Sequence, residues 1–355
     1  MSPLKPLDTQ RFNFEGELTR TELEQLAANP AVKVVQSEVR HPVNAPTWDL
    51  LNEILLAHRP DVELRLYGGV YDSLCDLSFL HRVRNVRRFS ADSLIRVAGI
   101  EHLGFLQNLE ELSIGIYGLE SFDFLDLIPP GIRSLSLEAT KSKKPRLDKL
   151  SRFHSLRELY LEGQQTGIDV LSRLLTLEKV TLRSISTANL DYICGLPRLW
   201  WLDIKLGGIR DLSAIENKHS IKYLELWQVR DLSDLSFISS LTGLQYLFLQ
   251  SLRNVKAIPD LSKLTMLRRL HLENMKGLKD VSAIAQAPAL EEFSHFSARN
   301  IEPGKYQPLL SIPTMRSVRV GFGSRKKNEA FAELATRNGK NLDAGGKLGK
   351  QFDFV

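Results

Sequence analysis

The sequence is poor in cysteine and methionine, and it has no long apolar run. Of its 355 residues only two are Cys and four are Met. Cys75 and Cys194 are too few for a disulfide framework or a cysteine metal site, which predicts a protein of a reducing compartment, the cytoplasm. Charges interrupt every apolar run, and the first residues lack the apolar core of a signal peptide. We therefore expect no membrane partner.

A strong charge of either sign is also missing. The 47 basic and 42 acidic residues leave a formal charge of +5, which over so long a chain gives only weak support to nucleic acid as a partner. With 43% hydrophobic and 25% charged residues, the composition is typical of a globular protein and excludes global disorder and collagen-like repetition.

Leucine is what the sequence has in excess, with 61 of the 355 residues. Much of it falls in the pattern apolar-x-x-apolar-x-apolar, whose copies start 21 to 25 residues apart from residue 86 to residue 315. A further copy at Leu64 and Leu66 precedes them, and the copies near Leu290 and Met315 are weaker. Such a constant period indicates one structural unit repeated along the chain.

Each copy predicts a short strand and a return segment. The last two apolar positions are two residues apart, so they point to the same side of an extended strand. The remaining ~17 residues lead back to the start of the next parallel strand, which predicts a solenoid. Return segments carry Asp-Leu-Ser or Asp-Val-Ser, in which Asp oxygens fit the N-caps of short helical turns; these aspartates are Asp76, Asp211, Asp234 and Asp280.

Segments such as residues 208–215, Gly-Ile-Arg-Asp-Leu-Ser-Ala-Ile, resemble the leucine-rich repeat family. The resemblance covers residues 60–321. It is strongest to the subclass with repeats of ~22 residues found in internalins and in a regulatory subunit of protein phosphatase one, and residues 321–328 resemble stand-alone bacterial repeat proteins. It implies a right-handed α/β horseshoe or arc, with a parallel sheet on the concave face and short helical turns on the convex face.

The sequence departs from the family just after the strands. The Asn usual there is mostly absent, with Ile185, Gly207 and Val229 in its place. The carbonyl groups of these turns therefore need other donors.

An open stack exposes apolar surface at both ends, so helical caps are expected there. We predict an N-terminal α/β cap at 1–60, with helices near 21–28 and 47–58 around a strand near 32–36. About 12 coils follow at 61–321. A capping helix at 322–338 begins after Ser324 as N-cap, and residues 339–355 are predicted to be a flexible tail.

The residue pattern does not predict an enzyme. The eight histidines lack the spacing of a helical metal site, and His295 falls on the inward side of its strand, as a core residue does. We expect no catalytic residues, metal or cofactor. A cryptic enzyme using the turn at residues 321–324, whose N–H groups could hold an anion, is the weakest alternative.

The outward residues of the strands are free of the core pattern and are therefore the candidates for binding. Large aromatic side chains on three successive strands, with charged residues among and beside them, have the composition of an interface hot spot. The predicted partner-binding residues are Trp201, Asp203, Lys205, Tyr223, Glu225, Trp227, Tyr246, Phe248, Arg269, His271 and Glu273. Because the face spans many coils, a folded protein partner suits it better than a small molecule.

These features predict a non-catalytic, monomeric scaffold that binds a protein through its concave face. The resemblance to a phosphatase regulator implies an enzyme as partner, and in a bacterium an inhibitor or immunity role fits equally well. The alternative is binding of nucleic acid or another acidic surface through two basic clusters. They comprise Arg82, Arg84, Arg87 and Arg88 in the first, and Lys141, Lys143, Lys144, Arg146, Lys149 and Arg152 in the second.

Overall fold

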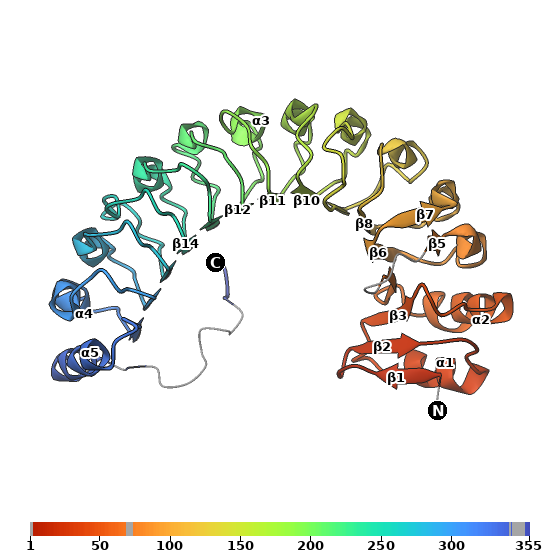
Figure 1. The fold of residues 1–355 in the computed structure, drawn as a ribbon, viewed down its shortest axis with the longest axis horizontal. Helices are drawn as coiled ribbons and strands as arrows, with labels where there is room; N and C mark the ends of the chain where they lie inside the picture. Colours follow the sequence, from red (N-terminus) through yellow and green to blue (C-terminus); the bar gives the residue numbers. More distant parts are fainter. Residues whose placement is uncertain (1–2, 69–73, 341, 343–351) are drawn as a thin grey trace. The chain divides into compact units, whose positions relative to one another are not determined.

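The computed structural model describes residues 3–68, 74–340, 342 and 352–355 (Figure 1). The chain divides into two units, Met1–Leu177 and Glu178–Val355. In each unit the strands lie along one side of the coils and the short helical turns along the other (Figure 1).

In the first unit the strands of the main sheet follow the order β1-β2-β3-β4-β6-β8-β9-β10. Only β1 and β2 pair antiparallel, and the other neighbours are parallel. β5 and β7 form a separate parallel pair. The bounds are β1 Leu4–Pro6, β2 Arg11–Phe14, β3 Val34–Glu38, β4 Glu63–Tyr67, β5 Leu74–Asp76, β6 Arg88–Leu94, β7 Arg96–Ala98, β8 Glu111–Ile116, β9 Ser134–Leu137 and β10 Glu158–Glu162.

In the second unit each strand pairs in parallel with the next, from β11 to β17. The pairing is in register, so equivalent residues of successive coils lie side by side. The bounds are β11 Lys179–Arg183, β12 Trp201–Lys205, β13 Tyr223–Trp227, β14 Tyr246–Gln250, β15 Arg269–Glu273, β16 Glu292–Phe296 and β17 Ser317–Val320.

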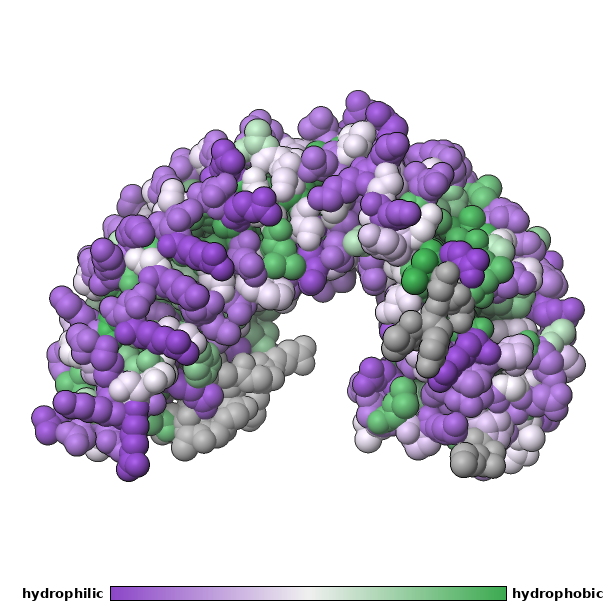
Figure 2. All heavy atoms as spheres, in the orientation of Figure 1, coloured by the Kyte–Doolittle hydropathy of each residue, from purple (hydrophilic) through white to green (hydrophobic). Residues whose placement is uncertain are grey.

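The twelve predicted strand motifs coincide with β4, β6 and β8 to β17, which confirms the α/β solenoid. Their inward apolar residues are buried: Leu202, Leu224 and Leu247, for example, have no exposed surface. Seen from the side drawn in Figure 2, the coils present mainly hydrophilic side chains. Leucine is abundant because each coil must fill the same interior positions.

Short helical turns return the chain between strands. Each predicted aspartate lies one residue before the N-cap, which is Leu77, Leu212, Leu235 or Val281, and accepts from the first N–H of the turn. The Oδ1 atoms of Asp76, Asp211 and Asp234 each accept from the backbone N–H two residues on, at 2.8 Å. Asp280 does the same at 2.9 Å. The 3₁₀ turns are Ser78–Arg82, Ile100–Phe105, Asp123–Asp126, Asp148–Arg152, Ile168–Arg173, Ser213–Ile215, Ser236–Ser240, Ser282–Gln286 and Pro303–Tyr306, and the short α-helices are α3 Asp191–Cys194 and α4 Gln307–Leu310.

Helices lie near both ends of the chain, as predicted. α1 (Arg20–Ala28) opens with a capping box between Thr19 and Glu22, and α2 (Ala45–Leu50) continues into a π-helical turn, Leu51–Leu56. β1 and β2 were not predicted, because their short runs carry no repeat motif. α5 (Arg325–Arg337) begins after Ser324, which accepts from Lys327 N–H, and buries Phe331.

Left-handed turns and backbone hydrogen bonds replace the missing Asn residues after the strands. Ser184, Leu206, Gln228, Ser251 and Asn274 each follow a strand directly, with φ between 51° and 57°. Their N–H groups donate to the last strand residue of the next coil at 2.7–2.9 Å. Within the turns, the Ile185 carbonyl accepts from Gly208 N–H at 3.0 Å and the Gly207 carbonyl from Arg230 N–H at 2.7 Å. Backbone N–H groups thus serve as donors in place of Asn side chains at these two positions.

The predicted flexible tail at 339–355 falls largely on residues 341 and 343–351, which lie outside the described residues. The last four residues, 352–355, are described, and they lie against the sheet of the second unit.

Candidate functional site

The first residues of β12, β13 and β14 form a stack of aromatic rings on the outward face of the sheet. Trp201 and Tyr223 lie with ring centroids 3.5 Å apart and planes 8° apart. Tyr246 continues the stack, 4.9 Å from Tyr223, and the Arg269 guanidinium of the next strand lies 5.4 Å from the Tyr246 centroid. In-register pairing places these residues side by side.

The middle position of the same strands carries acidic groups on β12 and β13. The Oδ2 atom of Asp203 accepts from Lys205 Nζ at 2.8 Å, and Glu225 lies 3.3 Å from the same ammonium group. Asp203 is only 4% exposed, and its Oδ1 is buried without a hydrogen-bond partner among the described residues. Burial, together with the carboxylate of Glu225, raises the pKa of Asp203 to about 6 against the pull of Lys205.

On β14 and β15 the middle position holds a stacked pair. Phe248 and His271 have ring centroids 4.6 Å apart and planes within 3°. His271 Nδ1 lies 2.5 Å from Ser294 Oγ, and its Nε2 lies 3.5 Å from Glu273. Burial lowers the pKa of His271, although Glu273 opposes the shift. The neutral imidazole therefore serves as a flat packing surface.

At the end of the strands Trp227 lies near two cations of the preceding strands. Lys205 Nζ is 5.9 Å and the Arg183 guanidinium 6.0 Å from its ring. This geometry favours cation–π attraction and leaves the half-buried indole at the end of β13. Glu273 ends β15 on the same face.

The structure thus brings together the eleven residues predicted for binding. The expectation that this face is exposed is wrong at Asp203, Tyr223, Arg269 and His271, which are 4%, 8%, 6% and 8% exposed. Cross-strand stacking and ion pairs cover these groups, and Phe352 and Phe354 cover the start of the strands.

Residues 352–355 lie across the starts of β12 to β15. Phe354 contacts Trp200, Trp201 and Tyr223, with ring centroids 5.2, 6.0 and 6.2 Å away. Phe352 lies 5.5 Å from the Tyr246 ring.

Four further residues complete this contact, and each stands directly before a strand: Trp200, Lys222, Gln245 and Arg268. These four residues were not predicted, because they lie outside the outward positions within the strands. Their spacing of 22 or 23 residues is the signal that could have identified them as one row.

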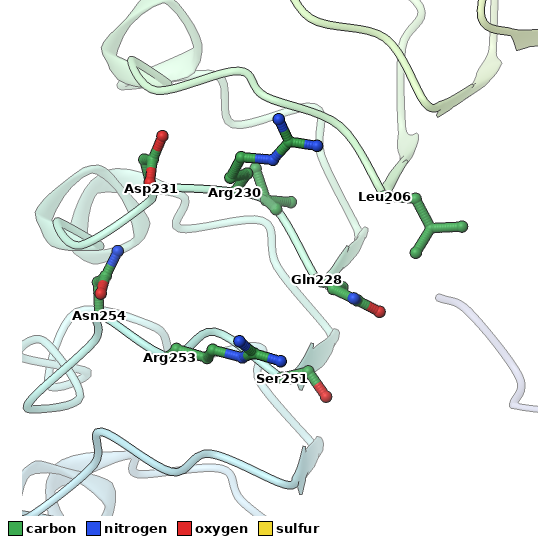
Figure 3. A pocket seen from close by; sticks show the side chains of 8 residues that line it. Leu206, Gln228, Arg230, Asp231, Ser251, Arg253 and Asn254 are labelled. Carbon is green, nitrogen blue, oxygen red and sulfur yellow. The ribbon is translucent and has the colours of Figure 1, made fainter.

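Two surface cavities lie in the second unit. One, of about 490 Å³, is lined by Trp200, Lys222 and Phe354, among others, and thus borders the same contact. The other, of about 500 Å³, lies over the turns after β12, β13 and β14 (Figure 3). Its lining includes Arg230, Asp231 and Arg253.

Nearby acids pair with part of each basic cluster. Arg82 pairs with Asp49 at 2.9 Å, Arg87 with Glu110 at 2.7 Å and Arg88 with Glu111 at 3.2 Å. In the second cluster Arg146 pairs with Asp148, and Lys149 with Asp123 and Asp126. Lys141, Lys143 and Lys144 are exposed. This arrangement weakens the case for a phosphate-binding surface.

The remaining candidates serve the core and the cap. His295 is 1% exposed, and its Nδ1 lies 2.7 Å from Tyr306 Oη; burial, together with His271, lowers its pKa to about 4. At the turn before α5, Phe322 is buried and its N–H donates to Asn328 Oδ1, which favours the capping role.

Within the described ranges, no group of three or more His, Cys, Asp or Glu side chains is placed to hold a metal ion. None of the helices in that part of the chain combines the length and the apolar character needed to cross a membrane.

The chain has the leucine-rich repeat fold. Among solved structures it is similar to an internalin, inlF, from Listeria monocytogenes, with 19% sequence identity and a TM-score of 0.56 over 87% of this chain and 90% of that one. A leucine-rich repeat protein from Leptospira interrogans is similar over 93% of this chain and 99% of its own, with 14% identity and a TM-score of 0.51. No family model and no curated protein matches the sequence. These likenesses confirm the predicted fold.

Proposed function

We propose that the protein is a non-catalytic scaffold that binds a folded protein partner through the outward face of its sheet. The aromatic and charged cluster on β12 to β15 is the observation that carries this proposal. Rigid rings held in a stack lose little conformational entropy on binding, and the surrounding charges give the partner a defined orientation. A regulator, an inhibitor and an immunity protein are the roles that use such a surface.

A cytoplasmic, bacterial setting is part of the proposal. Cys75 and Cys194 are both free, and Cys194 is exposed. An exposed free thiol is typical of a compartment in which thiols stay reduced.

Substitutions at Trp227 and Phe248 test this proposal. Trp227→Ala combined with Phe248→Glu removes two half-buried rings of the face without touching the inward leucines. Phe105→Glu is the matched control, because Phe105 is 42% exposed and lies on a 3₁₀ turn. Tagged proteins are used to capture partners from the native lysate, which are then compared by quantitative mass spectrometry.

We expect at least one protein to be bound by the wild type and by Phe105→Glu and to be lost from the double variant. Matching circular dichroism spectra show that all three proteins are folded. If the folded double variant retains every captured protein, the proposed binding face is wrong.

A further inference from the structure

Residues 352–355 present their side chains alternately to the sheet and to solvent. Phe352 and Phe354 face the aromatic stack, whereas Asp353 between them is exposed. This alternation is that of an extended segment, in which residues two apart share a side. The site therefore holds two aromatic side chains in an aromatic-x-aromatic arrangement.

A buried glutamine binds the backbone of this segment. Gln245 is 1% exposed. Its Nε2 donates to the backbone oxygen of Val355 at 2.9 Å, and its Oε1 accepts from the Val355 N–H at 2.9 Å. The Gln245 amide thus uses both its donor and its acceptor on main-chain groups that almost any residue can supply.

Two cations complete the backbone contacts. Lys222 Nζ donates to the Val355 backbone oxygen at 2.7 Å. Arg268 donates to the Asp353 backbone oxygen, and its guanidinium lies 4.6 Å from the Phe352 ring. These two cations therefore contact backbone oxygens and an aromatic ring rather than the Asp353 carboxylate.

Building on the proposed function, we propose that the start of strands β12 to β15 is a binding site for an extended aromatic-x-aromatic segment of a partner protein. Residues 352–355 occupy this site in competition with that segment. If they leave, the Gln245 amide loses both of these hydrogen-bond partners. An incoming segment must supply the same main-chain groups and the same aromatic surface, which defines the partner's chemistry.

Competition within one chain has a measurable consequence. A tethered segment has a local concentration on the order of 1 mM, so a free peptide with a dissociation constant of ~100 μM would bind about tenfold more weakly while that segment is in place. Weakening the internal segment should therefore strengthen binding of an added one.

The test measures binding of a fluorescein-labelled peptide, Gly-Lys-Gln-Phe-Asp-Phe-Val, to the full chain by fluorescence anisotropy. Phe352→Ala combined with Phe354→Ala in the protein should tighten binding about tenfold. Adding Gln245→Ala or Arg268→Ala to that variant should weaken binding at least tenfold. A peptide with both Phe replaced by Ala should not bind, and one with Asp replaced by Ala should bind as the original does.

Circular dichroism establishes that each variant is folded, and Arg268→Ala, at a half-buried position outside the core, gives an answer even if Gln245→Ala unfolds. Equal binding to the wild type and to the Phe352→Ala/Phe354→Ala variant would overturn the proposal and make residues 352–355 a fixed cap. A wild-type dimer that the same variant converts to monomer would assign the site to a second copy and also overturn it.

This result is independent of the capture experiment. Trp227 lies at the end of β13, whereas residues 352–355 cover the strand starts. The peptide could fail to bind while a captured partner is still lost from the Trp227→Ala/Phe248→Glu variant. That combination would refute the segment site but would still support the proposed function.

Discussion

The side-chain amide of Gln245 pairs with the backbone of Val355 through two hydrogen bonds of 2.9 Å, across 110 residues of sequence. Both partners of a buried amide are thus supplied by a segment that carries no repeat motif. Burying an amide without partners costs more than the hydrogen bonds gain, so this pair ties the segment to the second unit.

Gln245→Leu should release the segment while keeping the volume of the side chain. The Val355 N–H, which donates to Gln245 in the wild type, should then exchange with solvent at least tenfold faster in hydrogen-exchange mass spectrometry of the last peptide. Gln164→Leu is the matched control, since Gln164 is also fully buried but belongs to the first unit. Unchanged exchange in a folded Gln245→Leu protein would contradict the contact.

Asp203 should make the stability of the protein depend on pH. Burial raises its pKa from 3.8 to about 6, so the folded protein binds this proton more tightly than the unfolded chain. The stability that this gives is fully present below pH 3.8 and is lost as the pH rises through 6. Two pKa units correspond to about 3 kcal/mol.

Asp203→Asn does not titrate, so its stability relative to the wild type should rise between pH 4 and pH 7. Urea unfolding at a series of pH values measures the difference. Asp169→Asn, at an exposed position in the first unit, is the control. Its difference in free energy of unfolding from the wild type should stay constant between pH 4 and pH 7. If the free energy of unfolding of Asp203→Asn changed with pH in parallel with that of the wild type, the raised pKa of Asp203 would be contradicted.

Gln228 occupies a left-handed backbone conformation, with φ 52°, at an exposed position after β13. Asn tolerates this conformation better than Gln, and Asn274 already holds the equivalent position after β15 with φ 51°. Gln228→Asn should therefore stabilise the fold by about 0.5–1 kcal/mol, seen as a higher urea midpoint. Gln250→Asn, within a strand, should give no gain; an equal gain there would rule out the backbone explanation.

Gly207 lies where one coil closely approaches the previous one. A Cβ atom at this position would come 2.2 Å from the Ile185 carbonyl oxygen. Gly207→Ala should therefore destabilise the second unit by about 2 kcal/mol, because a backbone group must move. Gly195→Ala meets nothing within 4 Å and should change the midpoint little. If Gly207→Ala and Gly195→Ala have the same urea midpoint, the close approach does not affect the stability of the protein.

The strands could be predicted from the sequence because their cause is local and repeated. Leu202, Leu224 and Leu247 each fill the same interior position, and the constant period fixes their register. The aspartate hydrogen bonds were equally predictable, because Asp234 accepts from a backbone N–H only two residues along the chain. The missing Asn residues correctly indicated other donors, but not that left-handed turns would supply them.

The sequence by itself determined the solenoid, its core and the row of aromatic residues on its outward face. Only the tertiary structure decided which of those residues are accessible, because burial of Asp203 and His271 depends on side chains from other coils. It alone also placed Phe352 and Phe354 against Tyr246 and Trp200. A contact between a repeat and a segment outside the repeat follows no period, so no pattern in the chain could predict it.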